Sequence, residues 1–147
     1  MSLLLEALGE GSIRVGAHAD DWQHAVRLAG DALVASGRTS DDYTQAMIDT
    51  VLELGAYIVI APGLAMPHAR PSEAVLHTGL SLVTLDQPVK FGHHKNDPVS
   101  VVFGLAALDH DRHLELLSEF AAKMQQPGFV NSLLTCPDEA TIRGLFA

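Results

Sequence analysis

The sequence predicts an α/β fold in which helices cover a mostly buried sheet of four or five strands. Two helical patterns come first, apolar and β-branched runs occupy the middle of the chain, and helical periodicity returns toward the C-terminus. The chain has 147 residues, a common size for one compact domain, so we expect residues 1–147 to form a single domain. Hydrophobic residues make up 48% of the chain, which supplies enough apolar side chain for a buried core.

The first third of the chain carries the clearest helical patterns. Apolar residues recur at helical spacing over residues 22–33, an acidic residue stands at the start, and Gly37 ends the run. A second helix is expected after Ser40, with Asp41 and Asp42 in the first turn, where the helix dipole favours negative charge. Gly55 is its expected C-terminal stop. Two helices in series therefore precede the first long apolar run.

Short apolar and β-branched runs predict the strands. They lie at residues 12–15, 57–60, 64–66, 78–85 and 99–108, with a short extra strand at 87–91. After Asp109, helical periodicity continues until Pro127, and a short helix is expected at 129–134. A last helix is expected to run to Leu145 with Pro137 at its first position, and another short helix is expected at 3–8.

Composition excludes several classes of function. The formal charge is −9, from 9 Lys and Arg against 18 Asp and Glu, which argues against binding to nucleic acid or to an anionic membrane. Glu6 and Glu10 interrupt the apolar start, so neither a signal peptide nor a membrane anchor is expected there. The single cysteine, Cys136, cannot form an internal disulfide and fits a reducing compartment. We therefore expect a cytoplasmic protein.

The chain contains eight histidines, and surface positions account for most of them. Two lie around the start of the first long helix (His18 and His24), one lies before a strand (His77), and two are adjacent in a polar turn (His93 and His94). The adjacent pair is expected to point its side chains apart, which disfavours a metal site made from that pair alone. These five histidines therefore need no functional explanation.

Two other histidines stand where predicted strands end. Pro67 and Pro71 flank His68 closely and stiffen its loop, and His113 lies just after the long strand that ends near residue 108. In α/β folds, the loops at strand ends present catalytic groups, so these two histidines could meet. Arg70 lies two residues after His68 and offers a cationic fork for an oxyanion.

A neutral imidazole nitrogen is a good nucleophile for phosphorus, and a second histidine can stabilise charge on the transferring oxygens. This chemistry requires neither a metal nor a cofactor. The competing interpretation is a metal-dependent hydrolase that uses His68, His110 and His113 with Asp109 or Asp111. It lacks a His-Glu-x-x-His signature and a cysteine pair. A serine hydrolase is less favoured, because no Gly-x-Ser-x-Gly elbow is present, and no glycine cluster fits a phosphate-binding loop.

Several segments together resemble a known family. The run at 60–71 (Ile-Ala-Pro-Gly-Leu-Ala-Met-Pro-His-Ala-Arg-Pro) is followed by Gln-Pro-Val-Lys-Phe at 87–91, Asp-Pro-Val at 97–99, a long apolar strand and His113-Leu114 opening a helix. This ordered set resembles the mannitol/fructose-type (type 2) enzyme IIA domains of the bacterial sugar phosphotransferase system (PTS). Residues 21–25 and 57–68 resemble the ascorbate-specific branch most, and the similarity covers nearly the whole chain.

The resemblance implies a mixed five-stranded sheet between helices and a phosphotransferase function. It implies that His68 accepts a phosphoryl group from the phosphocarrier protein HPr and passes it to a cysteine of an enzyme IIB. The IIB in turn phosphorylates a sugar, ascorbate or a related one, as it enters through a membrane-embedded enzyme IIC. His113 corresponds to the second histidine of the family. A regulatory module phosphorylated on the same histidine stays open as an alternative, and so does a homodimer.

The sequence departs from the family pattern at one place. Many mannitol- and fructose-type members carry an arginine followed by glutamate shortly before the Pro-His motif, where this chain reads Leu52-Glu53. This departure weakens an assignment to mannitol or fructose and leaves the ascorbate-like one standing. Arg70 is our candidate for the residue that supplies the missing positive charge.

Overall fold

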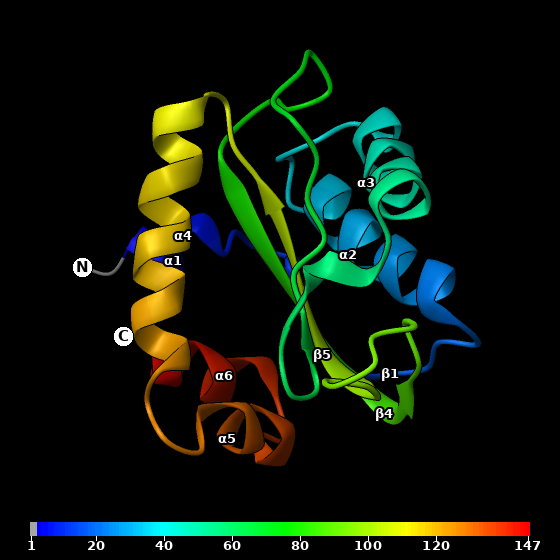
Figure 1. The fold of residues 1–147 in the computed structure, drawn as a ribbon. Coiled ribbons are helices and arrows are strands. Elements are labelled where there is room, and N and C mark those ends of the chain that lie inside the picture. Colours follow the sequence, from blue (N-terminus) through cyan, green and yellow to red (C-terminus); the bar gives the residue numbers. More distant parts are fainter. Residues whose placement is uncertain (1–2) are drawn as a thin grey trace.

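A computed structural model describes residues 3–147 of the chain. At its centre lies a five-stranded sheet in the order β1-β4-β5-β3-β2 (Figure 1). The strands are β1 (Ile13–Ala17), β2 (Val59–Ala61), β3 (Leu64–Ala65), β4 (Gly79–Val89) and β5 (Val99–Ala106). The β1/β4 and β3/β5 pairs are parallel, whereas the β4/β5 and β2/β3 pairs are antiparallel. The expected mixed sheet is therefore confirmed.

Helices cover both faces of this sheet (Figure 1). The helices α2 (Trp22–Ala35) and α3 (Asp41–Leu54) lie on one face, and α1 (Leu3–Ala7), α4 (His110–Met124), α5 (Phe129–Thr135) and α6 (Glu139–Phe146) lie on the other. Successive side chains of β4 point to opposite faces. Val83 therefore packs in the cluster with α2 and α3, whereas Leu82 packs in the cluster with the other helices. A sheet buried on both faces explains why its long strands are almost continuously apolar.

Side-chain caps and a glycine set the ends of the long helices. Asp21 caps α2 by accepting a hydrogen bond from the His24 N–H at 2.8 Å, and Asp109 caps α4 by accepting one from the Arg112 N–H at 2.8 Å. Gly55 ends α3 with a φ of +88°, which favours glycine. Among residues 3–147, no helix is both long and apolar enough to cross a bilayer.

Three expected boundaries are wrong. Residues 87–91 are not a separate strand, because β4 continues past a register shift after Thr84 and pairs Val89 with Val99. The exposed residues 86–88 interrupt the apolar pattern without ending the strand. Residues 56–58 form a 3₁₀ helix, η1 (Ala56–Ile58), so the strand expected at 57–60 begins later. Pro137 precedes the last helix, which Asp138 caps.

Candidate functional site

The parallel pairing of β3 with β5 brings two distant segments together. Because parallel strands end at the same edge of a sheet, the segment after β3 and the segment after β5 lie side by side. His68 lies in the first segment, and its loop contacts β5 through the Leu105 N–H, which donates to the Pro67 carbonyl at 3.1 Å. His113 lies in the first turn of α4, which follows β5. The His68 and His113 ring centroids are 5.2 Å apart, at an angle of 53°.

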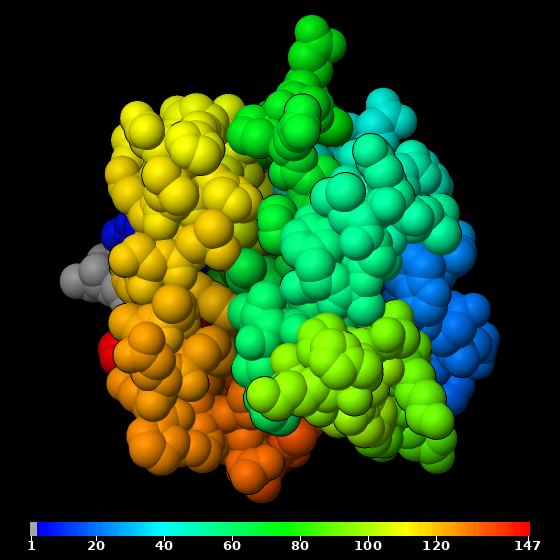
Figure 2. All heavy atoms as spheres, in the orientation of Figure 1, coloured from blue at the N-terminus to red at the C-terminus, as the bar shows by residue number. Residues whose placement is uncertain are grey.

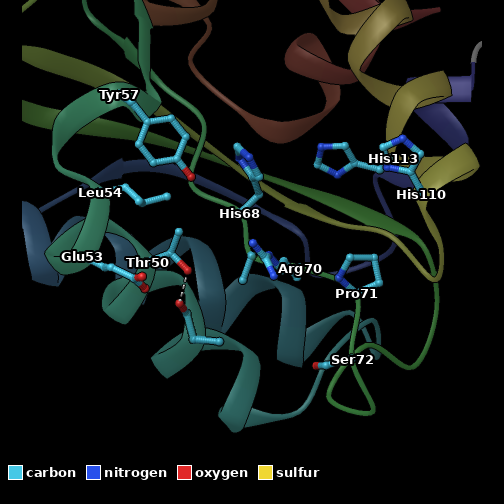
Figure 3. Close-up of a pocket in the computed structure, with 12 residues that line it drawn as sticks. Thr50, Glu53, Leu54, Tyr57, His68, Arg70, Pro71, Ser72, His110 and His113 are labelled. Carbon is cyan, nitrogen blue, oxygen red and sulfur yellow. Dashed lines mark hydrogen bonds between the residues drawn. The ribbon is translucent and has the colours of Figure 1, made fainter.

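One nitrogen of the His68 ring is held by the main chain. Its Nδ1 lies 2.9 Å from the Met66 carbonyl oxygen. A carbonyl oxygen only accepts hydrogen bonds, so the neutral ring carries its proton on Nδ1 and its lone pair on Nε2. The Tyr57 ring packs edge-on against His68 at a centroid distance of 5.9 Å. Figure 3 shows Tyr57 and His113 on opposite sides of the His68 ring.

Both histidines line a surface pocket of about 650 Å³. Its walls come from α3, from η1, from the His68 loop and from the start of α4. Figure 2 shows the hollow between α4, in yellow to orange, and the teal surface of α3. The lining holds three histidines (His68, His110 and His113) and one arginine, against a single carboxylate, Glu53. The histidine rings and the Arg70 guanidinium therefore give the pocket N–H donors suited to an anion, although the chain as a whole is acidic.

Arg70 lies on the exposed rim of the same pocket (Figure 3). Within the part of the chain that the structure describes, its guanidinium forms no ion pair or hydrogen bond. Its donors therefore remain available to an oxyanion. Leu52, which stands at the expected place of the family arginine, is 62% exposed and is not among the residues that line the pocket.

The pKa of His113 is lowered from its ordinary value of 6.5. Burial of the half-exposed ring is the largest cause, followed by the charges of His68 and His110. His113 is consequently neutral at neutral pH, when it can donate one ring N–H. Its folded-state pKa lies below the unfolded one, so the stability that neutral His113 contributes is present above pH 6.5 and is lost as pH falls through the folded pKa.

This shift gives a direct titration test. We expect the His113 pKa to be below 6.5 in the wild-type protein and to rise in a His68→Gln variant, which removes one cause of the shift. It should not return fully to 6.5, because burial remains the largest cause. NMR titration of the ring resonances measures both values, and His94→Gln, which changes an exposed histidine elsewhere, is the matched control. A wild-type value at or above 6.5 would contradict this prediction.

The other histidines bear on the metal interpretation. Among residues 3–147, no three His, Cys, Asp or Glu side chains come together in a way that could hold a metal ion. The expectation that His93 and His94 point apart is wrong, because their rings stack with a centroid distance of 5.0 Å and an interplanar angle of 13°. The His93 Nδ1 accepts a hydrogen bond from the Asn96 N–H at 2.9 Å, which stabilises the turn. The His93 Nδ1 atom therefore has a structural role in this turn.

Sequence reasoning missed Tyr57 as a pocket residue. The apolar, β-branched run at 57–60 indicated a strand, but Gly55 ends α3 and the chain then forms η1, which carries Tyr57 to the pocket. The available signal was an aromatic residue two positions after a helix-ending glycine. Burial raises the pKa of the Tyr57 hydroxyl, so the group remains protonated at neutral pH.

A mixed five-stranded sheet between helices is also the fold of mannitol-type enzyme IIA domains. The family described as "Phosphoenolpyruvate-dependent sugar phosphotransferase system, EIIA 2" matches residues 6–147, and the chain belongs to this family. The chain is therefore a phosphotransferase component of the PTS. Both the fold and the family expected from the sequence are thus confirmed.

The chain is similar to individual enzyme IIA proteins in sequence and in structure. The chain is 49% identical over 114 residues to the ascorbate-specific PTS system EIIA component of Escherichia coli (strain K12), covering 77% of this chain and 74% of that protein. The mannitol-specific cryptic phosphotransferase enzyme IIA CmtB of Escherichia coli has a TM-score of 0.86 at 33% identity, covering 98% of each chain. The Escherichia coli mannitol IIA has a TM-score of 0.82 at 26% identity, covering 95% of this chain and 99% of that one.

Proposed function

We propose that His68 accepts a phosphoryl group from phospho-HPr and passes it to a cysteine of an enzyme IIB. The observation that carries this proposal is the 2.9 Å contact between His68 Nδ1 and the Met66 carbonyl. It leaves Nε2 as the nucleophilic nitrogen of a ring that lines an anion-suited pocket. Labelled phosphoenolpyruvate, supplied through enzyme I and HPr, tests the proposal, because label should appear on the wild-type chain.

Each transfer step exchanges one bond to phosphorus for another. The His68 Nε2 lone pair attacks phosphorus, the bond from phosphorus to HPr breaks, and its electron pair stays with HPr. In the phosphorylated ring the proton stays on Nδ1, and this N–H donates to the Met66 carbonyl oxygen, which stabilises the positive charge that the ring gains. In the second step, the IIB cysteine thiolate attacks phosphorus and the electron pair of the P–N bond returns to Nε2.

His113 and α4 stabilise the transferring oxygens in this proposal. A neutral His113 ring donates one hydrogen bond to a phosphoryl oxygen, and it lies beside the His68 ring at 5.2 Å. His113 stands in the first turn of the 15-residue helix α4, whose N-terminus carries the positive end of the helix dipole. These groups are fixed before the phosphoryl group arrives, so they need little reorganisation during transfer.

Arg70 is the proposed charge clamp, in place of the family arginine absent at Leu52. We expect Arg70→Ala to slow phosphoryl transfer from phospho-HPr about tenfold, because a charge-assisted hydrogen bond to an oxyanion is worth roughly 1.5–3 kcal/mol when well formed and less at an exposed rim. Initial rates at fixed phospho-HPr measure the effect. Arg27→Ala also removes an exposed charge, from α2 and outside the pocket, and should leave the rate unchanged. A normal rate for Arg70→Ala would contradict the assignment.

The ascorbate-specific relatives support ascorbate, or a related sugar, as the transported substrate of the whole system. The IIA domain acts on the sugar indirectly, through IIB and the membrane enzyme IIC. Purified IIB from an ascorbate system should therefore take label from the phosphorylated chain faster than a mannitol IIB does. A stable phosphorylated chain that labels neither IIB would favour the regulatory alternative.

A further inference from the structure

The loop that carries His68 is attached to β5 as an interrupted extension of the β3/β5 pairing. The parallel register joins Leu64 with Val101 and Ala65 with Val102, and an isolated bridge then joins His68 with Leu105. One hydrogen bond of this bridge is direct, from the Leu105 N–H to the Pro67 carbonyl at 3.1 Å. The other bond of a parallel bridge would run from the Ala69 N–H to the Leu105 carbonyl.

The hydroxyl of Tyr43 stands between these two groups. It accepts a hydrogen bond from the Ala69 N–H at 3.0 Å and donates one to the Leu105 carbonyl at 2.6 Å. Tyr43 comes from the first turn of α3 and is fully buried. A hydroxyl with one donor and two acceptor sites can serve both contacts at once. Tyr43 thus links α3, the residue after His68, and the end of β5.

We infer that Tyr43 is a positioning residue that holds the His68 loop at a fixed spacing from β5 and so places the His68 ring for phosphoryl transfer. This inference rests on the proposed function of His68. The hydroxyl links the two groups that complete the bridge, because it bonds to the Ala69 N–H and to the Leu105 carbonyl at once. Tyr43 does not line the pocket, so its effect on transfer passes through the loop.

The chemistry of Tyr43 suits a permanent link. Burial raises the pKa of its hydroxyl to about 12, so the group stays protonated and keeps donating to the Leu105 carbonyl throughout the physiological range. Phenylalanine would keep the ring in the core but would remove the bridging atom. The Ala69 amide and the Leu105 carbonyl would then lose their shared partner or close directly on each other, and either change would move the loop.

The test compares Tyr43→Phe with wild type in transfer from phospho-HPr. We expect kcat to fall roughly ten- to hundredfold, since a displacement of about 1 Å at a reacting group has effects of that size. The KM for phospho-HPr should stay unchanged, because a fully buried side chain cannot contact HPr. In NMR, amide exchange at Ala69 should become faster and the His68 Nδ1 resonance should shift.

Ser81→Ala is the matched control. It removes another buried hydroxyl that donates to a main-chain carbonyl, that of Ala29 at 2.7 Å, on β4, which pairs with β5 on the side opposite β3 and the loop. With rates expressed per mole of folded protein, Ser81→Ala should transfer normally and keep the wild-type His68 resonance. Equal rates for Tyr43→Phe and Ser81→Ala would overturn the inference and leave the proposed function intact. An unlabelled wild-type chain would overturn the proposed function and the inference with it.

A measurement on the wild-type chain covers the case in which Tyr43→Phe fails to fold. The Ala69 amide should exchange with solvent as slowly as the amides of β5, because the buried Tyr43 oxygen holds it. Exchange at the rate of the exposed amides of Arg70, Ser72 and Glu73 would show that no such link exists in solution and would overturn the inference.

Discussion

Replacing His68 with alanine should reduce phosphoenolpyruvate-dependent labelling of the chain to background. The proposed reaction passes through a covalent bond between phosphorus and His68 Nε2, and the alanine variant has no atom that can form it. The Met66 carbonyl oxygen orients the His68 ring through its contact with Nδ1, and no other histidine among the described residues has that contact. Gel autoradiography after incubation with enzyme I, HPr and labelled phosphoenolpyruvate measures the loss.

His94→Ala is the control for the His68 variant. It removes an exposed histidine from a turn outside the pocket, so its labelling should match wild type. Circular dichroism should show both variants folded, since His68 belongs to neither apolar cluster of the core. Label that persists in His68→Ala would mean that another histidine is the acceptor, and the proposed relay would be wrong.

The second large effect is expected for His113→Ala, which should slow transfer from phospho-HPr by roughly 10²–10³-fold, the usual cost of removing one preorganised donor to a developing oxyanion. The His113 ring is the partner nearest to His68 on the α4 side, and its lowered pKa keeps it neutral before the phosphoryl group arrives. Rapid-quench measurement of a single turnover gives the rate directly. His113→Gln, which restores an N–H donor, should recover part of it.

His110→Ala separates a specific role of His113 from the general charge of the pocket. His110 lies on the same turn of α4 and lines the pocket, but it is exposed. Its removal should cost much less than removal of His113. Equal effects of the two variants, or a wild-type rate for His113→Ala, would contradict the role given to His113.

Periodicity predicted most of the helices and strands, because each buries one regular face or both. The pattern that indicates α2 corresponds to residues such as Val26 and Leu33, which are fully buried against the sheet. Prediction from apolar periodicity failed where burial changes within one helix or strand. In β4, the exposed residues 86–88 break the apolar run although the backbone continues to Val89. A strand that leaves the cover of the helices therefore looks like two segments in sequence.

The candidate site was partly predictable for a topological reason. His68 and His113 follow segments that were expected to be strands, and the parallel pairing of β3 with β5 places both at one edge. Tyr43 and Tyr57 could not be assigned in this way. Tyr43 fits the apolar stripe of α3 as well as any core residue, and only the tertiary contacts of its hydroxyl reveal a link to the loop. Its two partners lie 26 and 62 positions away along the chain, and contacts at such separations leave no periodic pattern in the sequence.

The most direct test of the relay is to locate the phosphoryl group and then follow its departure. The wild-type chain, phosphorylated through enzyme I and HPr, should carry an acid-labile phosphoryl group on Nε2 of His68, as identified by ³¹P and ¹⁵N NMR. Adding purified IIB of an ascorbate system should transfer that group to the IIB cysteine. A phosphoryl group on His68 Nδ1 or on another residue, or one that IIB fails to remove, would contradict the account.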